Sequence, residues 1–330
     1  MTDPHALSSR QLLALALISL TAPAVTVCAA LPWWWVLFAT VVIALLSLLL
    51  LRVFRSSSAR SLTASLLRLR TPGKLLLLGT AAFVLLAMRR LCELSPSAFP
   101  DTPPTLFVPL TMLAVCAWAC ASSRAAVLRA VGVSSFFVFA AYALIAVYAI
   151  PCIRLDYVFR ASENDGFLLA TLLQPLLCAY LVRREDPVFL RPSSLLMFAV
   201  VPTAAGLLTA SVPGAAGSFY RMAKSVQVVS AAGRIEPIVS AALTVGWFTS
   251  FCLHALTIGE IIAALGGSRR LGSVFACAFA ATGAVAEIPI PSYIYAAGAT
   301  VFCVLVPLFT LCLEARKKPR KTLKKGEKRG

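Results

Sequence analysis

Ten long apolar runs, separated by short charged or Pro/Gly-containing segments, determine what this chain can fold into. Each run is close to the roughly 20 residues that an α-helix needs to cross a bilayer. Of the 330 residues, 60% are hydrophobic and 13% are charged, which is more apolar surface than a water-soluble core can bury. We therefore expect an all-α integral membrane protein without a soluble domain. The expected spans are 12–30, 32–51, 75–92, 105–121, 131–151, 166–182, 193–212, 238–265, 272–288 and 293–313.

Most of the 30 lysines and arginines lie in alternate segments between these runs. Cytoplasmic loops of membrane proteins carry such an excess, so we expect both termini in the cytoplasm. The even number of spans agrees, because it places the two termini on the same side. The basic tail 314–330 is expected to be disordered. Nucleic-acid binding is not expected, because the charge is distributed as an orientation signal. A signal peptide at 12–30 is a second interpretation, but the tryptophans at 33–35 lead directly into another apolar run, and we interpret the first run as a retained span.

Two connecting segments carry apolar residues at helical spacing and basic residues between them. We expect each to form a short amphipathic helix on the membrane surface, 60–70 on the cytoplasmic side and 213–236 on the outer side. The apolar positions are Leu62, Leu66 and Leu69 in the first segment and Phe219, Ala223 and Val226 in the second.

The ten cysteines fall mostly inside the apolar runs, where a thiol behaves as a small hydrophobic side chain. They do not form a disulfide framework, although a single bridge between Cys92 and Cys152 stays open. Cys116 and Cys120 share a helix face at i, i+4. Because no histidine or acidic residue stands near them in the sequence, we interpret this pair as packing and expect no metal site.

Ten spans divide into two sets of five, and because five is odd the second set must enter the membrane from the opposite side. The chain then reads as one multi-pass membrane domain with an inverted repeat, 11–151 and 166–313, followed by the basic tail. This is the organisation of many secondary transporters, whose solute sites lie near the middle of the bilayer where the two repeats meet.

The first span of each predicted repeat is interrupted near its middle. Thr21, Ala22 and Pro23 interrupt the first run, and Gln174 and Pro175 interrupt the sixth. A proline frees a backbone carbonyl, and unpaired backbone at this depth is tolerated where it lines a cavity. We therefore predict broken first and sixth helices with a ligand site at these five residues. The alternative is that the prolines only kink their helices, as other prolines in the spans do.

Few ionisable residues lie in or near the spans. His254 is interpreted as a hydrogen-bonded packing residue rather than a proton relay, because no carboxylate stands at i±3 or i±4. Glu236, Glu260 and Glu287 lie close enough to an interface to reach water. The sequence contains no paired carboxylates within a span, no Gly-rich phosphate loop and no His-rich metal spacing. We expect no enzymatic activity and no cofactor.

Two stretches carry a family resemblance. The segment 7–11 before the first span, together with 219–221 and 233–236 ahead of a long span containing Trp247, resembles the membrane-permease (B) subunit of spore germinant receptors. That family belongs to the amino acid/polyamine/organocation permease superfamily. The most specific part of the likeness is Arg-Ile-Glu at 234–236.

The resemblance implies a LeuT-like five-plus-five bundle with its ligand pocket at the broken first and sixth helices. It implies a receptor that senses a small nutrient such as an amino acid and signals germination, beside A and C subunits in the spore inner membrane. Tyr220, Arg234 and Glu236 would then form or brace an outer gate. The chain departs from the pattern at 21–23, where such permeases commonly have a Gly-containing break.

Two other functions stay open. One is an ion-coupled amino-acid transporter of the same fold, working without partner subunits. The other is a non-transporting membrane scaffold whose basic tail docks a partner or anionic lipid.

Overall fold

The computed structural model describes residues 9–28, 33–56, 61–98, 106–154, 156, 166–181, 200, 204, 207–208, 211–212, 219–225, 236–286 and 291–316. Within these ranges the chain is almost wholly helical and has no strand. The α-helices are α1 (Ser9–Cys28), α2 (Trp33–Ser56), α3 (Leu62–Leu67), α4 (Thr71–Leu94), α5 (Phe107–Ser122), α6 (Arg124–Ala149), α8 (Cys178–Leu181), α10 (Phe219–Ser225), α11 (Glu236–Ala264), α12 (Arg269–Val285), α13 (Ser292–Ala299) and α14 (Val306–Arg316). Four further helical segments are η1 (Ser95–Ala98), η2 (Ile150–Cys152), η3 (Gly166–Leu177) and η4 (Thr300–Leu305).

Five of the described helical stretches are long and apolar enough to cross a membrane, and two shorter apolar helices accompany them. The outward faces are apolar as well: Phe136 is 83% exposed, Val133 78% and Trp118 74%. Large apolar side chains that project from a helix bundle in this way are suited to lipid rather than to water. The prediction of an all-α chain is confirmed for the described residues, and five of their helical stretches have the length and composition that the predicted membrane protein requires. The long stretches are Arg10–Val27, Thr71–Leu94, Arg124–Cys152, Pro237–Ala264 and Ser292–Glu314.

Each predicted span except 193–212 contains a described helix, and that run lies mostly outside the described residues. The two predicted surface segments contain the short helices α3 and α10. Leu62 and Leu66 of α3 are fully buried against the bundle, and so is nearly all of Ala223 in α10. The tail from 317 onward and Val226 lie outside the described residues.

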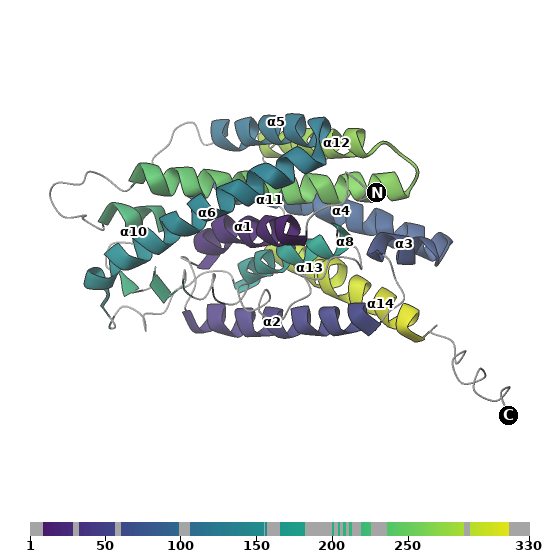
Figure 1. The fold of residues 1–330 in the computed structure, drawn as a ribbon, viewed down its shortest axis with the longest axis horizontal. Coiled ribbons are helices and arrows are strands. Elements are labelled where there is room, and N and C mark those ends of the chain that lie inside the picture. The colour runs from purple at the N-terminus through teal and green to yellow at the C-terminus, as the bar shows by residue number, and fades with distance from the viewer. Residues whose placement is uncertain are drawn as a thin grey trace, which may run out of the picture.

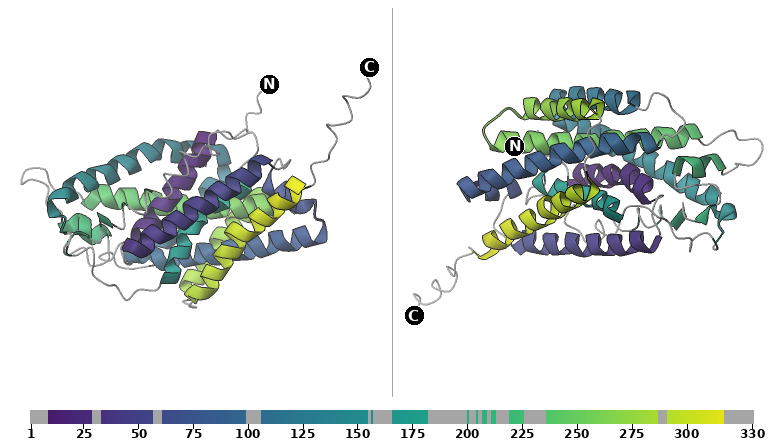
Figure 2. Two further views of the ribbon diagram at one scale, coloured as in Figure 1. Left: turned by 90° about the horizontal axis from the view of Figure 1, so that it is seen from below. Right: turned by 180° about the vertical axis from the view of Figure 1, so that it is seen from behind.

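At the centre of the bundle, α1 packs against α11, α6 and η3. α1 and α11 approach each other closely, because a Cβ atom added to Gly246 would stand 2.7 Å from the Cβ of Ala22. Figure 1 shows α5 and α12 side by side along one edge of the bundle, and both views of Figure 2 show α2 next to α14 on the opposite edge. The first span is therefore enclosed by protein, which its burial confirms.

Ion pairs gather at the helix ends. Glu260 at the end of α11 pairs with Arg124 and lies 2.9 Å from Arg269. Arg68, just after α3, lies 3.3 Å from Glu314 in α14. The turn between α11 and α12 lies at the same end of the bundle as α3 (Figure 1). Glu260 is therefore a paired group at a helix end, as its interpretation as an interfacial residue requires, while Glu287 lies outside the described residues.

A π-helical turn interrupts the last span. Val306 donates its N–H to the carbonyl of Val301, five residues earlier. The next carbonyl in this pattern, that of Phe302, has no backbone donor because Pro307 lacks an N–H. The hydroxyl of Tyr180 on α8 donates to it at 2.9 Å. The proline thus creates an unpaired carbonyl inside the bundle, and a neighbouring helix supplies the missing donor.

Candidate functional site

The first span does not break. Pro23 lies inside α1, which is one α-helix from Ser9 to Cys28. The prediction that Thr21, Ala22 and Pro23 interrupt this helix is wrong.

The reason lies on α11. Pro23 has no N–H, so the carbonyl of Ser19, four residues earlier, loses its helical partner. The hydroxyl of Ser250 stands 2.6 Å from that carbonyl oxygen and donates to it. The same hydroxyl stands 3.0 Å from the carbonyl of Gly246, so its one proton is shared between the two oxygens. With the freed carbonyl satisfied from a neighbouring helix, α1 keeps its winding.

The predicted α1 residues line a tight helix contact. Thr21 and Ala22 are fully buried and lie against Gly246 of α11. The Thr21 hydroxyl donates to the carbonyl of Ile18 at 2.8 Å, and Pro23 is buried beside them. These residues therefore hold α1 to α11 and present no free backbone carbonyl.

The sixth span does depart from α-helical winding, and it does so along most of its length. Residues Gly166–Leu177 form a 12-residue 3₁₀ helix that contains Pro175, and the four residues of α8 follow. Runs of 3₁₀ helix beyond 3–4 residues are uncommon and mark strain or function. At about 2.0 Å per residue in η3 and about 1.5 Å in α8, this short segment reaches about 30 Å, the thickness of a hydrocarbon core.

Gln174 is the polar residue that this segment carries into the bundle. Its side chain is 2% exposed, and Nε2 donates to the hydroxyl of Tyr295 on α13 at 2.5 Å. Oε1 is buried and has no hydrogen-bond partner among the described residues. Leaving an amide oxygen without a donor costs about 1–3 kcal/mol, so this atom is an acceptor that a ligand could satisfy.

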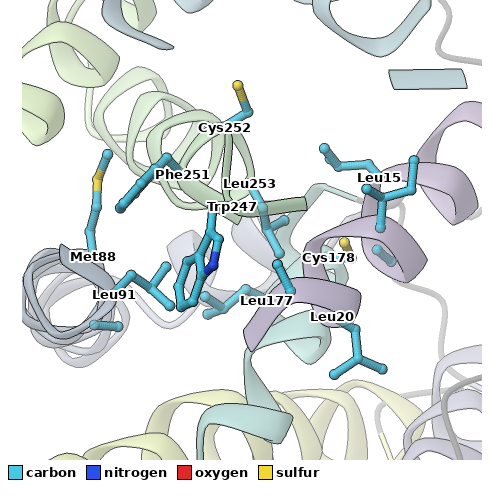
Figure 3. Close-up of a cluster of buried hydrophobic side chains, with 14 of the residues drawn as sticks. Leu15, Leu20, Met88, Leu91, Leu177, Cys178, Trp247, Phe251, Cys252 and Leu253 are labelled. Carbon is cyan, nitrogen blue, oxygen red and sulfur yellow. The ribbon is translucent and has the colours of Figure 1, made fainter. Parts of the chain in front are cut away.

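Trp247 of α11 offers the complementary group. It is fully buried, and its indole Nε1 has no acceptor among the described residues. Figure 3 shows the ring between Met88 and Leu91 on one side and Leu177 on the other. Because a 3₁₀ helix has three residues per turn, Gln174 stands one turn from Leu177 on the same face. The unpartnered indole N–H thus lies beside η3, one turn from the residue that carries the unpartnered amide oxygen.

His254 lies farther along α11. Its ring is fully buried, and Nδ1 stands 2.7 Å from the carbonyl of Ser250. A carbonyl only accepts, so Nδ1 carries the proton and Nε2 of the neutral ring is a lone-pair acceptor. That Nε2 has no partner in the described part of the chain. The interpretation of His254 as hydrogen-bonded is confirmed.

The five predicted ligand residues are divided between two contacts. First and sixth spans do pack together, as expected, but Thr21 and Ala22 face α11 while Gln174 reaches α13. No hydrogen bond among the described residues joins Thr21 to Gln174.

The predicted outer gate is described only in part. Tyr220 is half-buried in α10, which packs against α11. Glu236 begins α11, and Arg234 lies outside the described residues, as does the side chain of Glu236. The gate stays a prediction.

Sequence reasoning missed Tyr295 and Ser250, and it named Trp247 only for its place in a resemblance. A buried tyrosine or serine looks like any other polar residue of an apolar run until the fold supplies its partner. A weak signal existed for Trp247, since an indole N–H within a span requires a partner or a ligand.

No protein-family model and no curated protein matches this chain.

Proposed function

We propose that this chain is a permease-like membrane subunit that binds a small zwitterion, such as an amino acid, where η3 meets α11. The observation that carries the proposal is the buried, unpartnered Oε1 of Gln174 in a non-α segment. In the proposal, binding at this point is passed to partner subunits and signals germination, as the resemblance to spore germinant receptors implies.

The two unpartnered atoms suit the two ends of an amino acid. Gln174 Oε1 accepts from an ammonium group, and Trp247 Nε1 donates to a carboxylate. Hydrogen bonds to charged groups contribute about 1.5–3 kcal/mol each. A ligand with one donor and one acceptor a few bonds apart relieves both unsatisfied groups at once, whereas an apolar ligand relieves neither.

The pairing of helices matches a five-plus-five inverted repeat only in part, because the extensive α1–α11 and α11–α12 contacts have no comparable η3–α4 or α4–α5 counterpart among the described residues. In the predicted repeat, α4 corresponds to α11 and α5 to α12. Exchanging the two halves therefore turns the α4–α12 contact into the α11–α5 contact, and both contacts exist. The same exchange turns α1–α6 into η3–α13, and both exist. The pairs α1–η3, α4–α11 and α5–α12 map onto themselves and are also in contact. Ten crossings with both termini in the cytoplasm belong to the proposal, and the ion pairs at the helix ends are consistent with that orientation.

The test is a binding measurement on the purified chain in detergent micelles. A thermal-shift screen of the standard amino acids identifies the ligand, and a titration measures its affinity. Gln174→Leu should weaken binding about 10- to 100-fold, because it removes a hydrogen bond to a charged group. Gln11→Leu, the same change near the start of α1, should leave affinity unchanged. Equal affinities of the two variants would exclude Gln174 from the site, and a screen with no hit would contradict the proposal.

A second function, an ion-coupled amino-acid transporter, is favoured by the free Nε2 of His254, a buried base next to the α1–α11 contact. Liposomes containing only this chain distinguish the two. Transport would be supported if a pH gradient drove uptake of the labelled ligand and His254→Gln abolished that uptake. Binding without uptake supports the receptor subunit.

A further inference from the structure

Four buried cysteines from three helices converge on one point of the bundle. Cys116 and Cys120 lie on α5 and Cys252 on α11, and their sulfur atoms all stand within 4.8 Å of one another. Cys277 of α12 lies beside Cys116. All four side chains are buried, and α5, α11 and α12 pack pairwise around them. The neighbours that Cys116 and Cys120 lack in the sequence are thus supplied by the fold.

The spacing of the sulfurs suits one shared cation. A metal–sulfur bond of about 2.3 Å places two sulfurs about 3.8 Å apart in a tetrahedral site and about 4.0 Å apart in a trigonal one. Cys116 Sγ and Cys120 Sγ are 3.9 Å apart, and the i, i+4 spacing on α5 gives both the same direction. A disulfide requires about 2.0 Å, and all four are free thiols.

Packing alone does not require sulfur at this point. Elsewhere in the described bundle, Cys178 and Cys303 are fully buried one at a time, as small apolar side chains are. Here the thiols of separate helices meet each other instead of aliphatic groups. Thiolates select soft cations such as Cu(I) and Zn(II) over Na⁺ or Mg²⁺, which prefer oxygen ligands.

We propose that Cys116, Cys120 and Cys252 bind one soft, thiophilic cation, Cu(I) or Zn(II), between α5, α11 and α12. Each thiol that coordinates as a thiolate releases its proton, so binding lowers the pH of an unbuffered solution. Cys277 lies beside Cys116 but outside this group of three sulfur atoms.

The cation site is separate from the proposed solute site. Figure 3 shows Cys252 on the side of α11 away from Trp247. Both sites therefore depend on α11, but neither uses a residue of the other. Failure of one proposal leaves the other intact, and their tests do not share a readout.

The experiment uses the full chain, purified with reductant in detergent micelles. It is titrated with Zn(II), and separately with Cu(I) held by a competing chelator. We expect about one metal per chain by elemental analysis and a thiolate-to-metal absorption band in the ultraviolet. Cys252→Ser and Cys120→Ser should weaken binding at least 10-fold. Cys303→Ser, at a single buried cysteine, should bind like the unsubstituted chain.

A second measurement avoids substitution. At a denaturant concentration where the buried thiols of the metal-free chain react with a membrane-permeant maleimide, the bound metal should protect Cys116, Cys120 and Cys252 of the unsubstituted chain, as peptide mass spectrometry would show, while exposed Cys312 reacts in both states. Cys277→Ser should weaken binding less than Cys252→Ser, because Cys277 is not among the three cysteines whose sulfur atoms all lie within 4.8 Å of one another. The proposal would be overturned if Zn(II) and Cu(I) both failed to bind at a stoichiometric ratio. It would also be overturned if Cys252→Ser left binding unchanged.

Discussion

The first and sixth spans each carry a buried proline near mid-length, yet they wind differently. α1 continues as an α-helix through Pro23, whereas η3 is a 3₁₀ helix on both sides of Pro175. In α1 a neighbouring helix compensates for the proline, because Ser250 donates to the carbonyl that Pro23 frees. In the 3₁₀ winding of η3, the carbonyl that loses its donor at Pro175 is that of Leu172, three residues earlier.

A third proline fits the same rule. Pro307 frees the carbonyl of Phe302, and Tyr180 of α8 donates to it. Here the span keeps helical winding with one wider turn. At Pro23 and Pro307, the proline determines which carbonyl is freed, and an adjacent helix supplies the donor. Four substitutions test this comparison, in order of decreasing effect.

The largest effect is expected at the contact between α1 and α11, the helix that carries the donor Ser250. Gly246→Ala places a methyl group 2.7 Å from the Cβ of Ala22, so the two helices must separate, at a cost of about 2–3 kcal/mol of unfolding free energy. Chemical denaturation in micelles measures it. Gly132→Ala is the matched control, because the added methyl meets only Gln11 at 3.8 Å. Equal stability of the two variants would contradict close packing at this point.

Removing the donor itself should cost less. Ser250→Ala leaves the carbonyl of Ser19 buried and unpaired, which lowers the unfolding free energy by about 1–2 kcal/mol. Pro23→Ala restores the backbone N–H, so the same serine substitution should cost about half as much in that background. Additive effects in this double-mutant cycle would contradict the explanation that Ser250 keeps α1 continuous by compensating for Pro23. Ser240→Ala, near the start of the same helix, is the control.

The rule extends to the last span with a smaller effect. Tyr180→Phe keeps the ring but removes the hydroxyl that lies 2.9 Å from the carbonyl of Phe302. We expect a loss of about 1 kcal/mol, the usual net value of one hydrogen bond, seen as a lower unfolding midpoint. Tyr293→Phe, at a ring that is 60% exposed, should change the midpoint little. If Tyr180→Phe shifted the midpoint as little as the control does, a compensating donor would stabilise the bundle at Pro23 but not at Pro307.

The smallest effect on stability is expected at Gln174. Gln174→Leu leaves the buried Tyr295 hydroxyl without its donor but also removes an unpaired oxygen, so the two changes offset each other in part and the net loss should stay below about 1 kcal/mol. Unfolding without ligand should therefore be almost unchanged while ligand affinity falls. A large loss of stability without ligand would assign Gln174 to the structure of the bundle instead.

Hydropathy predicts where the helices lie, because a span requires a run of apolar residues whatever its neighbours are. It places α3 and α10 correctly and finds Gln174 as a buried amide. It cannot predict that α1 stays continuous, since the donor to Ser19 comes from a residue 231 positions away. The cysteine cluster is hidden for the same reason. Cys116 and Cys120 are visible as a pair, but the contact with Cys252 exists only in the folded bundle.

The 12 residues of η3 could also change in length by changing their helical winding. Rewinding them into an α-helix shortens the segment by about 6 Å, because the rise falls from about 2.0 to about 1.5 Å per residue. Such a shortening does not require any helix to separate from its neighbours, and it would transmit ligand binding in the middle of the bilayer to one membrane surface. Spin labels at Ala170 and Ala179 would measure it, and an unchanged separation on adding ligand would exclude it.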